Sequence, residues 1–346
     1  MREPSSLRER DPDPFSEQMI ALMVAAAGIE CEVLDAEPLR TGSATTYRVG
    51  VRDQEGDRRT VVFKAAVEGD ATGLRREPAL LRYVADHTSI PVPDVYGSHL
   101  QPDDLPAPSF VMEHVEGGSP TRASARENGD TGWPDGILDD IVRQAGRHLA
   151  ALHDCGPVSG FGPITVDDGT LTVTDPAGSW QSWLRELAAE TEGDTRLDGL
   201  ASTVQSVLDS ELPELPAVDP VLAHYDYQPR NVVVDEGAGR VRAVLDWGGA
   251  RSVHDEFELA VTEQYCSGWA PLGSDKRQRV RASLHEGYRD RRSLATDEAF
   301  RRRRRLYLLL STVASLSWAP YWSGPRAERF VASQRSLVES LLDQGP

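Results

Sequence analysis

Lysine is nearly absent from this chain of 346 residues. Its 37 basic residues include only two lysines, Lys64 and Lys276, whereas 55 residues are aspartate or glutamate, so the formal net charge is −18. Without an overall positive field to meet phosphate charge, the chain is not expected to bind nucleic acid. Abundant acids with few lysines are typical of halophilic proteins, but a GC-rich genome also favours arginine. Adaptation to high salt is therefore a hypothesis, which unfolding in molar KCl and in dilute buffer would test.

Cysteine is also scarce, and long apolar runs are missing. The cysteines Cys31, Cys155 and Cys266 show no C-x-x-C spacing, which predicts a reducing compartment and no disulfide framework. The first 15 residues hold no apolar signal core, and the longest apolar stretch, near Leu306–Trp318, is too short to span a bilayer. We expect a soluble, cytoplasmic protein with no membrane partner. The oligomeric state is left open.

A glycine-rich G-x-G-x-x-G signature is missing, but a shorter turn precedes Lys64. Gly42 and Ser43 stand before a predicted strand at 46–51, and Lys64 lies on the next one, at 60–65. Backbone N–H groups and hydroxyls of such a turn can point at phosphates. A lysine kept in a lysine-poor chain suggests chemistry that arginine serves less well, such as a compact positive charge on phosphate.

Glu77 follows Lys64 by 13 residues, in a segment with helical character. A helix there would bring Glu77 back to Lys64 as an orienting ion pair. The alternative is a surface helix with ordinary charges. Pro78 leaves two forms open, because a residue before proline avoids the α region. Either the helix begins at Pro78 with Glu77 at its cap, or the helix is kinked.

The most informative stretch reads H-Y-D-Y-Q-P-R-N over residues 224–231. Two apolar runs around a glycine-containing turn follow it, at 232–245, and predict an antiparallel hairpin. Because a hairpin returns the chain to its start, Asn231 is expected beside Asp246. Amide and carboxylate oxygens suit Mg²⁺. Asp226 stands on the same entering loop, where it could take a proton from a hydroxyl aimed at phosphate.

A structural interpretation of these residues competes with the functional one. Asp and Asn beside a hairpin are often only turn formers, and His224 alone is more often a buried structural histidine. The combination of H-x-D-x-x-x-x-N, a hairpin and L-D-W in this order favours the functional interpretation, because kinase catalytic loops have the same spacing.

The remaining pattern predicts two lobes after a mobile tail at residues 1–14. An N-terminal nucleotide-binding lobe covers 15–115, and a C-terminal catalytic and acceptor-binding lobe covers 116–346. The predicted helices are 15–27, 137–152, one around Trp180 and most of 255–342, and the further predicted strands are 32–34, 95–99 and 109–115. The basic run Arg301–Arg305 is interpreted as a solvated face paired with carboxylates, in preference to an anion site.

With these residues in place, the chain resembles the aminoglycoside phosphotransferase / choline kinase-like family. That family usually reads H-G-D-L-H-P-G-N and then I-D-W, whereas this chain has Tyr225, Gln228 and Arg230 at three of those positions. The resemblance implies an α+β, protein-kinase-like fold of two lobes. The smaller lobe would hold an antiparallel sheet with one main helix, and the larger would be mostly helical.

The resemblance also implies roles for the site residues. Asp226 would be the base, and Asn231 and Asp246 would hold Mg²⁺. Lys64, positioned by Glu77, would contact the nucleotide phosphates, together with the turn at Gly42 and Ser43. The backbone of Glu113–Val115 would hold adenine. His224 would brace the loop. Glu258 stands where the family often has aspartate, so its role is open.

The function implied is transfer of the ATP γ-phosphoryl group to a hydroxyl of a small acceptor, of the aminoglycoside, amino-alcohol or sugar class. A nucleotide-binding pseudokinase is the main alternative, because of the changes at Tyr225 and Gln228. A metal-dependent phosphohydrolase is a third interpretation, but the chain lacks paired His/Asp ligand motifs and Lys64 would be unexplained. Its metal ligands would be His224, Asp226, Asn231, Asp246 and His254. A protein kinase is disfavoured by D-W in place of D-F-G.

Overall fold

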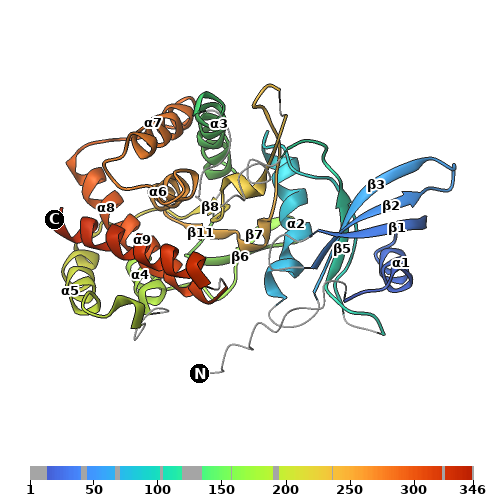
Figure 1. Cartoon of the computed structure of the whole chain (residues 1–346), viewed down its shortest axis with the longest axis horizontal. Coiled ribbons are helices and arrows are strands. Elements are labelled where there is room, and N and C mark those ends of the chain that lie inside the picture. Colours follow the sequence, from blue (N-terminus) through green and yellow to red (C-terminus); the bar gives the residue numbers. More distant parts are fainter. Residues whose placement is uncertain are drawn as a thin grey trace. The chain divides into compact units, whose positions relative to one another are not determined.

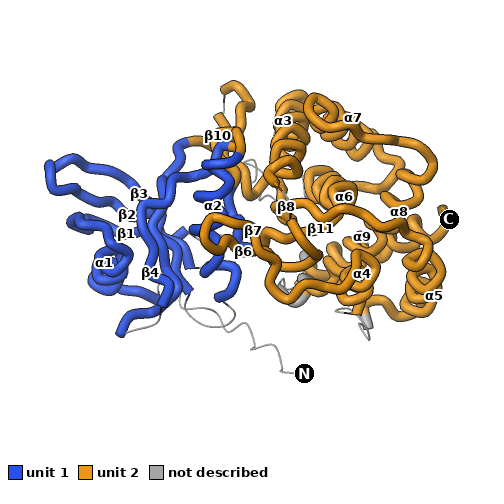
Figure 2. Tube along the Cα trace, turned by 180° about the vertical axis from the view of Figure 1, so that it is seen from behind, with its two compact units in different colours: residues 1–87, 91–116, 245–248 blue, residues 88–90, 117–244, 249–346 orange. Residues whose placement is uncertain are grey.

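The computed structural model describes residues 14–39, 45–66, 71–101, 104–118, 135–156, 158–189, 195–235, 237–321 and 324–344. Figure 1 labels the elements, and Figure 2 shows two compact units. Unit 1 comprises residues 1–87, 91–116 and 245–248, and unit 2 comprises 88–90, 117–244 and 249–346. The predicted tail at 1–14 lies outside the described residues except for Pro14.

Unit 1 is built on a five-stranded antiparallel sheet in the order β1-β2-β3-β5-β4. The bounds are α1 Glu17–Ala26, β1 Glu32–Leu39, β2 Thr45–Arg52, β3 Arg58–Ala65, α2 Thr72–His87, β4 Val95–His99 and β5 Ser109–Glu113. The Ser16 hydroxyl caps α1 by accepting from the Met19 N–H. The strands therefore occur where predicted, with β1 longer and β5 shorter than expected.

The alternation of β3 divides its side chains between the two faces of the sheet. Val61 and Phe63 join the apolar core under α1, together with Ile20 and Met23. Lys64 points to the other face and meets α2. Figure 1 shows α1 and α2 on opposite sides of this sheet. Because side chains alternate between the two faces along a strand, the packing residues of β3 and its charged Lys64 lie on opposite faces of the sheet.

Helix α2 runs from Thr72 and contains Pro78 in its interior. Of the two forms left open, a helix that begins at Pro78 with Glu77 at its cap is therefore excluded. Proline removes one backbone donor, but buried apolar residues on both sides of it, such as Leu74 and Leu81, hold the two parts of the helix against the sheet.

Unit 2 is mostly helical and carries two small sheets. The four-stranded sheet has the order β7-β6-β11-β8, and β9 pairs with β10 as a hairpin. The helices are α3 Asp135–His153, α4 Trp180–Ala189, α5 Ala201–Glu211, α6 Asp255–Cys266, α7 Asp275–Arg289, α8 Glu298–Ser315 and α9 Gly324–Asp343. The strands are β6 Gly162–Asp167, β7 Thr170–Val173, β8 Val221–Ala223, β9 Val232–Val234, β10 Val241–Val244 and β11 Arg251–Val253. The hairpin was predicted, whereas the four-stranded sheet was not.

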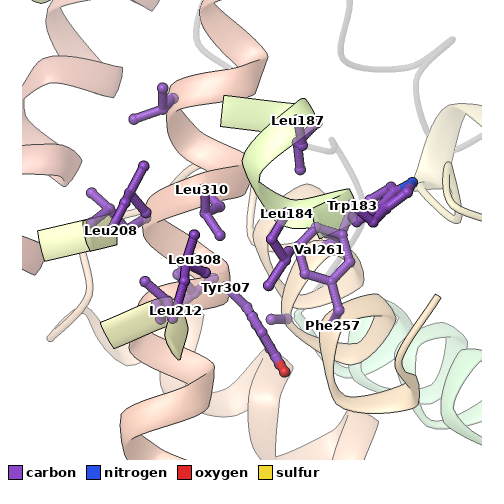
Figure 3. Close-up of a cluster of buried hydrophobic side chains, with 14 of the residues drawn as sticks. Trp183, Leu184, Leu187, Leu208, Leu212, Phe257, Val261, Tyr307, Leu308 and Leu310 are labelled. Carbon is purple, nitrogen blue, oxygen red and sulfur yellow. The ribbon is translucent and has the colours of Figure 1, made fainter. Parts of the chain in front are cut away.

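The apolar core of unit 2 forms where α4, α6 and α8 meet. Figure 3 shows Trp183, Phe257 and Tyr307 packed together with leucines of α4, α5 and α8. The Trp180 indole N–H donates to the Tyr307 hydroxyl at 2.9 Å, so these two polar groups are paired inside the core. In the part of the chain that the structure describes, no helix is both long and apolar enough to cross a bilayer.

The basic run on α8 is less solvated than predicted. Arg303 and Arg304 bind Glu256 and Glu263, with N–O distances of 2.7 and 2.8 Å. Arg305 is buried and pairs with Glu211. The predicted pairing with carboxylates is confirmed, but the last three arginines turn inward because one side of a helix must face its neighbours.

Candidate active site

The loop between β8 and β9 holds Asp226 in a ring of donors within unit 2. The Asn231 amide N–H donates to Asp226 Oδ2 at 2.7 Å and to the Asp226 carbonyl at 3.0 Å. Gln228 donates to Oδ1, and the Arg230 guanidinium lies 3.3 Å from Oδ2. The short helical turn Pro229–Asn231 brings Asn231 back onto Asp226. The carboxylate is therefore fixed in orientation before any substrate binds.

These bonds also orient the Asn231 amide. A carboxylate and a carbonyl oxygen only accept, so the amide nitrogen must face Asp226 and the amide oxygen must point elsewhere. Among the hydrogen bonds of the described residues, none is accepted by that oxygen. An oxygen of this kind fits a hard cation such as Mg²⁺.

The chain adopts a left-handed conformation at Tyr225, with φ of 66°. Glycine adopts this region without strain, and a tyrosine does not. The Tyr225 ring is held by edge contact with Trp183 at 6.1 Å and by the Arg251 guanidinium 5.0 Å above it. Aromatic packing therefore offsets the backbone strain at this position. His224 braces the loop, since its Nδ1 accepts from the Asp226 N–H at 3.2 Å.

The hairpin that follows has the predicted form. Val232 pairs with Val244, and Val233 with Ala243. Gln144 of α3 bonds to the hairpin through its side chain, donating to Gly239 at 2.9 Å. Asn231 belongs to unit 2 and Asp246 to unit 1, so their meeting across the hairpin stays a prediction.

Lys64, Glu77 and Asp246 form a charged cluster within unit 1. Lys64 Nζ lies 2.7 and 2.9 Å from the two Glu77 oxygens and 3.5 Å from Asp246 Oδ1. The Glu77 side chain is 2% exposed and that of Asp246 is 43% exposed. Burial alone would lower the pKa of Lys64, but the two carboxylates raise it, so the ammonium stays charged. The predicted ion pair is present, with a second carboxylate on its solvent side.

The segment that carries Asp246 is fastened to α2. The Trp247 N–H donates to Glu77, and a Cβ placed on Gly73 would lie 2.9 Å from the Gly248 carbonyl oxygen. Two glycines thus let the backbones approach closely, and Asp246 itself has a φ of 67°. Residues 245–248 belong to unit 1 for this reason, although they are far from it in sequence.

The model of the phosphotransferase enzyme family, APH, matches residues 35–304. The chain belongs to this family. The match covers both the Lys64 cluster and the Asp226 loop, and it agrees with the resemblance drawn from the motifs. No curated protein sequence matches the chain.

Solved structures of APH-family enzymes share the fold of this chain. A thermostable mutant of aminoglycoside phosphotransferase APH(4)-Ia, bound to AMP-PNP and hygromycin B, is 17% identical with a TM-score of 0.63, covering 94% of this chain and 98% of its own. APH(2″)-IIIa with GDP and kanamycin is 15% identical with a TM-score of 0.60, covering 94% and 99%. APH(3″)-Id from Streptomyces rimosus with ADP and streptomycin is 18% identical with a TM-score of 0.55, covering 87% and 99%. The predicted kinase-like α+β fold is confirmed.

The other predicted nucleotide contacts of this APH-family chain stay predictions. Gly42 and Ser43 lie outside the described residues. The Glu113 N–H already donates to the Asp94 carbonyl at 2.8 Å. The N–H of Val115 has no such partner among the described backbone groups, which leaves Val115 as the better candidate for an adenine contact.

Glu258 is the residue whose role could not be read from the sequence. One of its oxygens accepts from the Tyr225 N–H at 2.9 Å, and the other lies 2.7 Å from His153 Nε2. His153 also bonds to the Tyr288 hydroxyl at 2.9 Å. A chain of buried polar contacts therefore runs from α7 through α3 and α6 to the loop. The replacement of the family's usual aspartate by Glu258 was the one available signal.

Proposed function

We propose that this APH-family phosphotransferase is a small-molecule kinase that transfers the γ-phosphoryl group of ATP to a hydroxyl of a small acceptor. The observation that supports this most directly is the Asp226 loop, in which the Asn231 amide fixes the carboxylate and keeps its own oxygen available. Structures of similar fold hold adenine or guanine nucleotides, so assays should compare ATP with GTP.

In the proposed reaction, the acceptor oxygen forms a bond to the γ-phosphorus while the bond from that phosphorus to the bridging oxygen of ADP breaks. Asp226 takes the proton of the attacking hydroxyl. Lys64, oriented by Glu77, would bind the nucleotide phosphates. Asn231 and Asp246 would hold Mg²⁺, which neutralises phosphate charge during transfer. Most of the catalysis would come from positioning and charge.

The variant Asp226→Ala tests the role of the base. We expect kcat to fall by about 10²- to 10⁴-fold, since general-base catalysis contributes on that order. ATP affinity should be nearly intact, whereas Asp246→Ala should weaken metal–nucleotide binding. ADP release and calorimetric ATP titration measure the two effects. Asp209→Ala, on the exposed side of α5, is the control. Lost ATP affinity with retained turnover in Asp226→Ala would contradict the assignment.

A nucleotide-binding module without transfer activity is the second candidate. The observation that favours it is that Gln228 and Arg230 already donate to both oxygens of Asp226. The double variant Gln228→His with Arg230→Gly restores the family residues at these two positions. If the chain is a kinase, its turnover should not depend on that change. Transfer that appears only in the double variant, across a panel of hydroxyl compounds, would establish the second candidate instead.

A further inference from the structure

A cavity of about 310 Å³ lies within unit 2, with walls from β6, α4, β11, α6 and α8. Its aromatic wall is made by Trp183, Tyr225 and Tyr265, the first of which is labelled in Figure 3. Aromatic faces with a few polar groups are typical of a small-molecule site.

The cavity adjoins the proposed base. Tyr225 directly precedes Asp226 in the chain and lines the cavity with its ring. Tyr265 lines it as well, and burial together with the nearby Asp226 carboxylate raises the pKa of Tyr265. The cavity is therefore where an acceptor would sit if Asp226 takes the proton of its hydroxyl.

Among the described residues that line this cavity, Arg251 is the one with a basic side chain. Its guanidinium lies over the Tyr225 ring, and its Nε is enclosed without a hydrogen-bond partner. No ion pair joins Arg251 to any carboxylate of the described residues. Two other arginines of unit 2 differ from it in this respect, since Arg277 pairs with Glu263 at 3.4 Å and Arg303 with Glu256 at 2.7 Å. The Arg251 guanidinium is therefore positioned by the Tyr225 ring, and its charge is left for a ligand.

Two carboxylates, Asp175 and Glu186, also line the cavity, but both residues are exposed. Water and salt screen exposed charges strongly, whereas a half-buried guanidinium keeps more of its field. The guanidinium also presents a planar fork that binds carboxylate or phosphate through two parallel hydrogen bonds. The charge that can select a ligand inside the cavity is therefore positive.

We propose that the acceptor of this kinase carries an anionic oxygen group, a carboxylate or a phosphate, which Arg251 binds while the acceptor packs on Tyr225. This inference rests on the proposed kinase function, and it separates this chain from enzymes that take polycationic acceptors. Neutral hydroxyl compounds would bind more weakly because they leave the guanidinium unpaired.

The test uses matched hexoses with the full chain. Glucuronate, glucose 6-phosphate, glucose and glucosamine share one ring and carry a carboxylate, a phosphate, no charge and an ammonium group. Glycerate, glycerol 3-phosphate and glycerol form a smaller set. Binding is measured by calorimetry without ATP, and transfer by ADP release with ATP–Mg²⁺. The variants are Arg251→Gln and Arg251→Lys, with Arg185→Gln on the exposed face of α4 as control.

We expect an anionic member to bind about 10- to 100-fold more tightly than its neutral partner, the range for charge-assisted hydrogen bonds. Arg251→Gln should remove that preference, Arg251→Lys should keep part of it, and Arg185→Gln should keep all of it. Preference for the carboxylate over the phosphate, or the reverse, identifies the group.

Other outcomes separate the two proposals. The inference would be overturned if all members bound equally, if glucosamine bound more tightly, or if no anionic member bound. A preference for anions that is unchanged in Arg251→Gln would also overturn it. In each case the kinase proposal would still be tested by ADP release. Binding of anions that depends on Arg251, with no ADP release from any acceptor, would overturn the kinase function instead.

Discussion

Two single residues, Lys64 and Tyr225, determine the charge and the packing around the candidate catalytic groups. Lys64 keeps its charge inside unit 1 because Glu77 and Asp246 surround it. Tyr225 takes a backbone conformation that favours glycine, and it gains aromatic contacts that a glycine lacks. Lys64 therefore keeps a positive charge in the cluster of unit 1, and Tyr225 adds an aromatic ring next to Asp226 in unit 2.

At the scale of single residues, replacing Lys64 should show how much its ion pair with Glu77 contributes to stability. The variant Lys64→Met leaves a carboxylate buried without a counter-charge, and we expect the free energy of unfolding of unit 1 to fall by about 3–5 kcal/mol. Adding Glu77→Leu should recover most of the loss, because an apolar pair often replaces a buried ion pair at little cost. Urea unfolding at pH 7 measures both variants.

The control for this prediction is the only other lysine of the chain. Lys276 lies at the start of α7 and is partly exposed, so Lys276→Met should change stability by less than about 0.5 kcal/mol. If Lys64→Met and Lys276→Met lowered the free energy of unfolding equally, the Lys64 ion pair would make no particular contribution to stability.

At the scale of elements, α3 and α7 pack with unusually close backbones. A Cβ on Gly146 would lie 2.2 Å from the Leu284 carbonyl oxygen, and one on Gly287 would lie 1.9 Å from that of Arg143. Real Cβ atoms do not approach so closely, so each glycine is required by the crossing. This contact fixes the position of α3. Gln144 of α3 bonds to the hairpin, and His153 of α3 lies against Glu258.

The crossing predicts opposite effects for two Gly→Ala changes. Gly287→Ala should destabilise unit 2 by about 1–3 kcal/mol or more, because backbone must move to admit the methyl group. Gly136→Ala, in α3 with open space around it, should be neutral or stabilise by up to about 1 kcal/mol. Thermal and urea unfolding give both values, and a stabilising Gly287→Ala would refute the close crossing.

At the scale of the whole molecule, buried neutral histidines make stability depend on pH. Burial lowers the pKa of His148 to about 4 and that of His285 to about 4. The unfolded chain binds these protons near pH 6.5. Between pH 6.5 and 4 the unfolded state therefore binds more protons than the folded state, and stability falls as the pH falls.

This linkage predicts how steeply the free energy of unfolding falls with pH, and replacing one histidine should reduce that slope. Each histidine contributes about 1.4 kcal/mol per pH unit at most, and the loss begins below about pH 6.5. His285→Gln should remove the contribution of His285, so the free energy of unfolding of this variant should depend less on pH than that of the unchanged chain. Urea unfolding at steps between pH 7 and 4 measures the difference. Equal slopes would contradict the role of His285.

Contacts between residues close together in the chain could be predicted from the sequence, whereas contacts between residues far apart in the chain could not. The hairpin and its Val232–Val244 pair could be predicted because turn and strands lie within 13 residues. The four-stranded sheet could not, since its strands have three to six residues and β6 pairs with β11 almost 90 residues later. Glu258 and His153 meet across 105 residues, and no local pattern marks that contact.

By itself the sequence determined the local chemistry of this protein. The Asp226 loop and the hairpin after it could be predicted from neighbours in the chain, because backbone propensity and short loops act over a few residues. The scarcity of lysine marked Lys64 as a candidate. Only the tertiary structure decided that residues 245–248 join unit 1, that Arg251 lies over Tyr225, and that α3 and α7 cross on glycine. These contacts depend on packing between segments distant in sequence, where shape and burial select partners that local pattern does not encode.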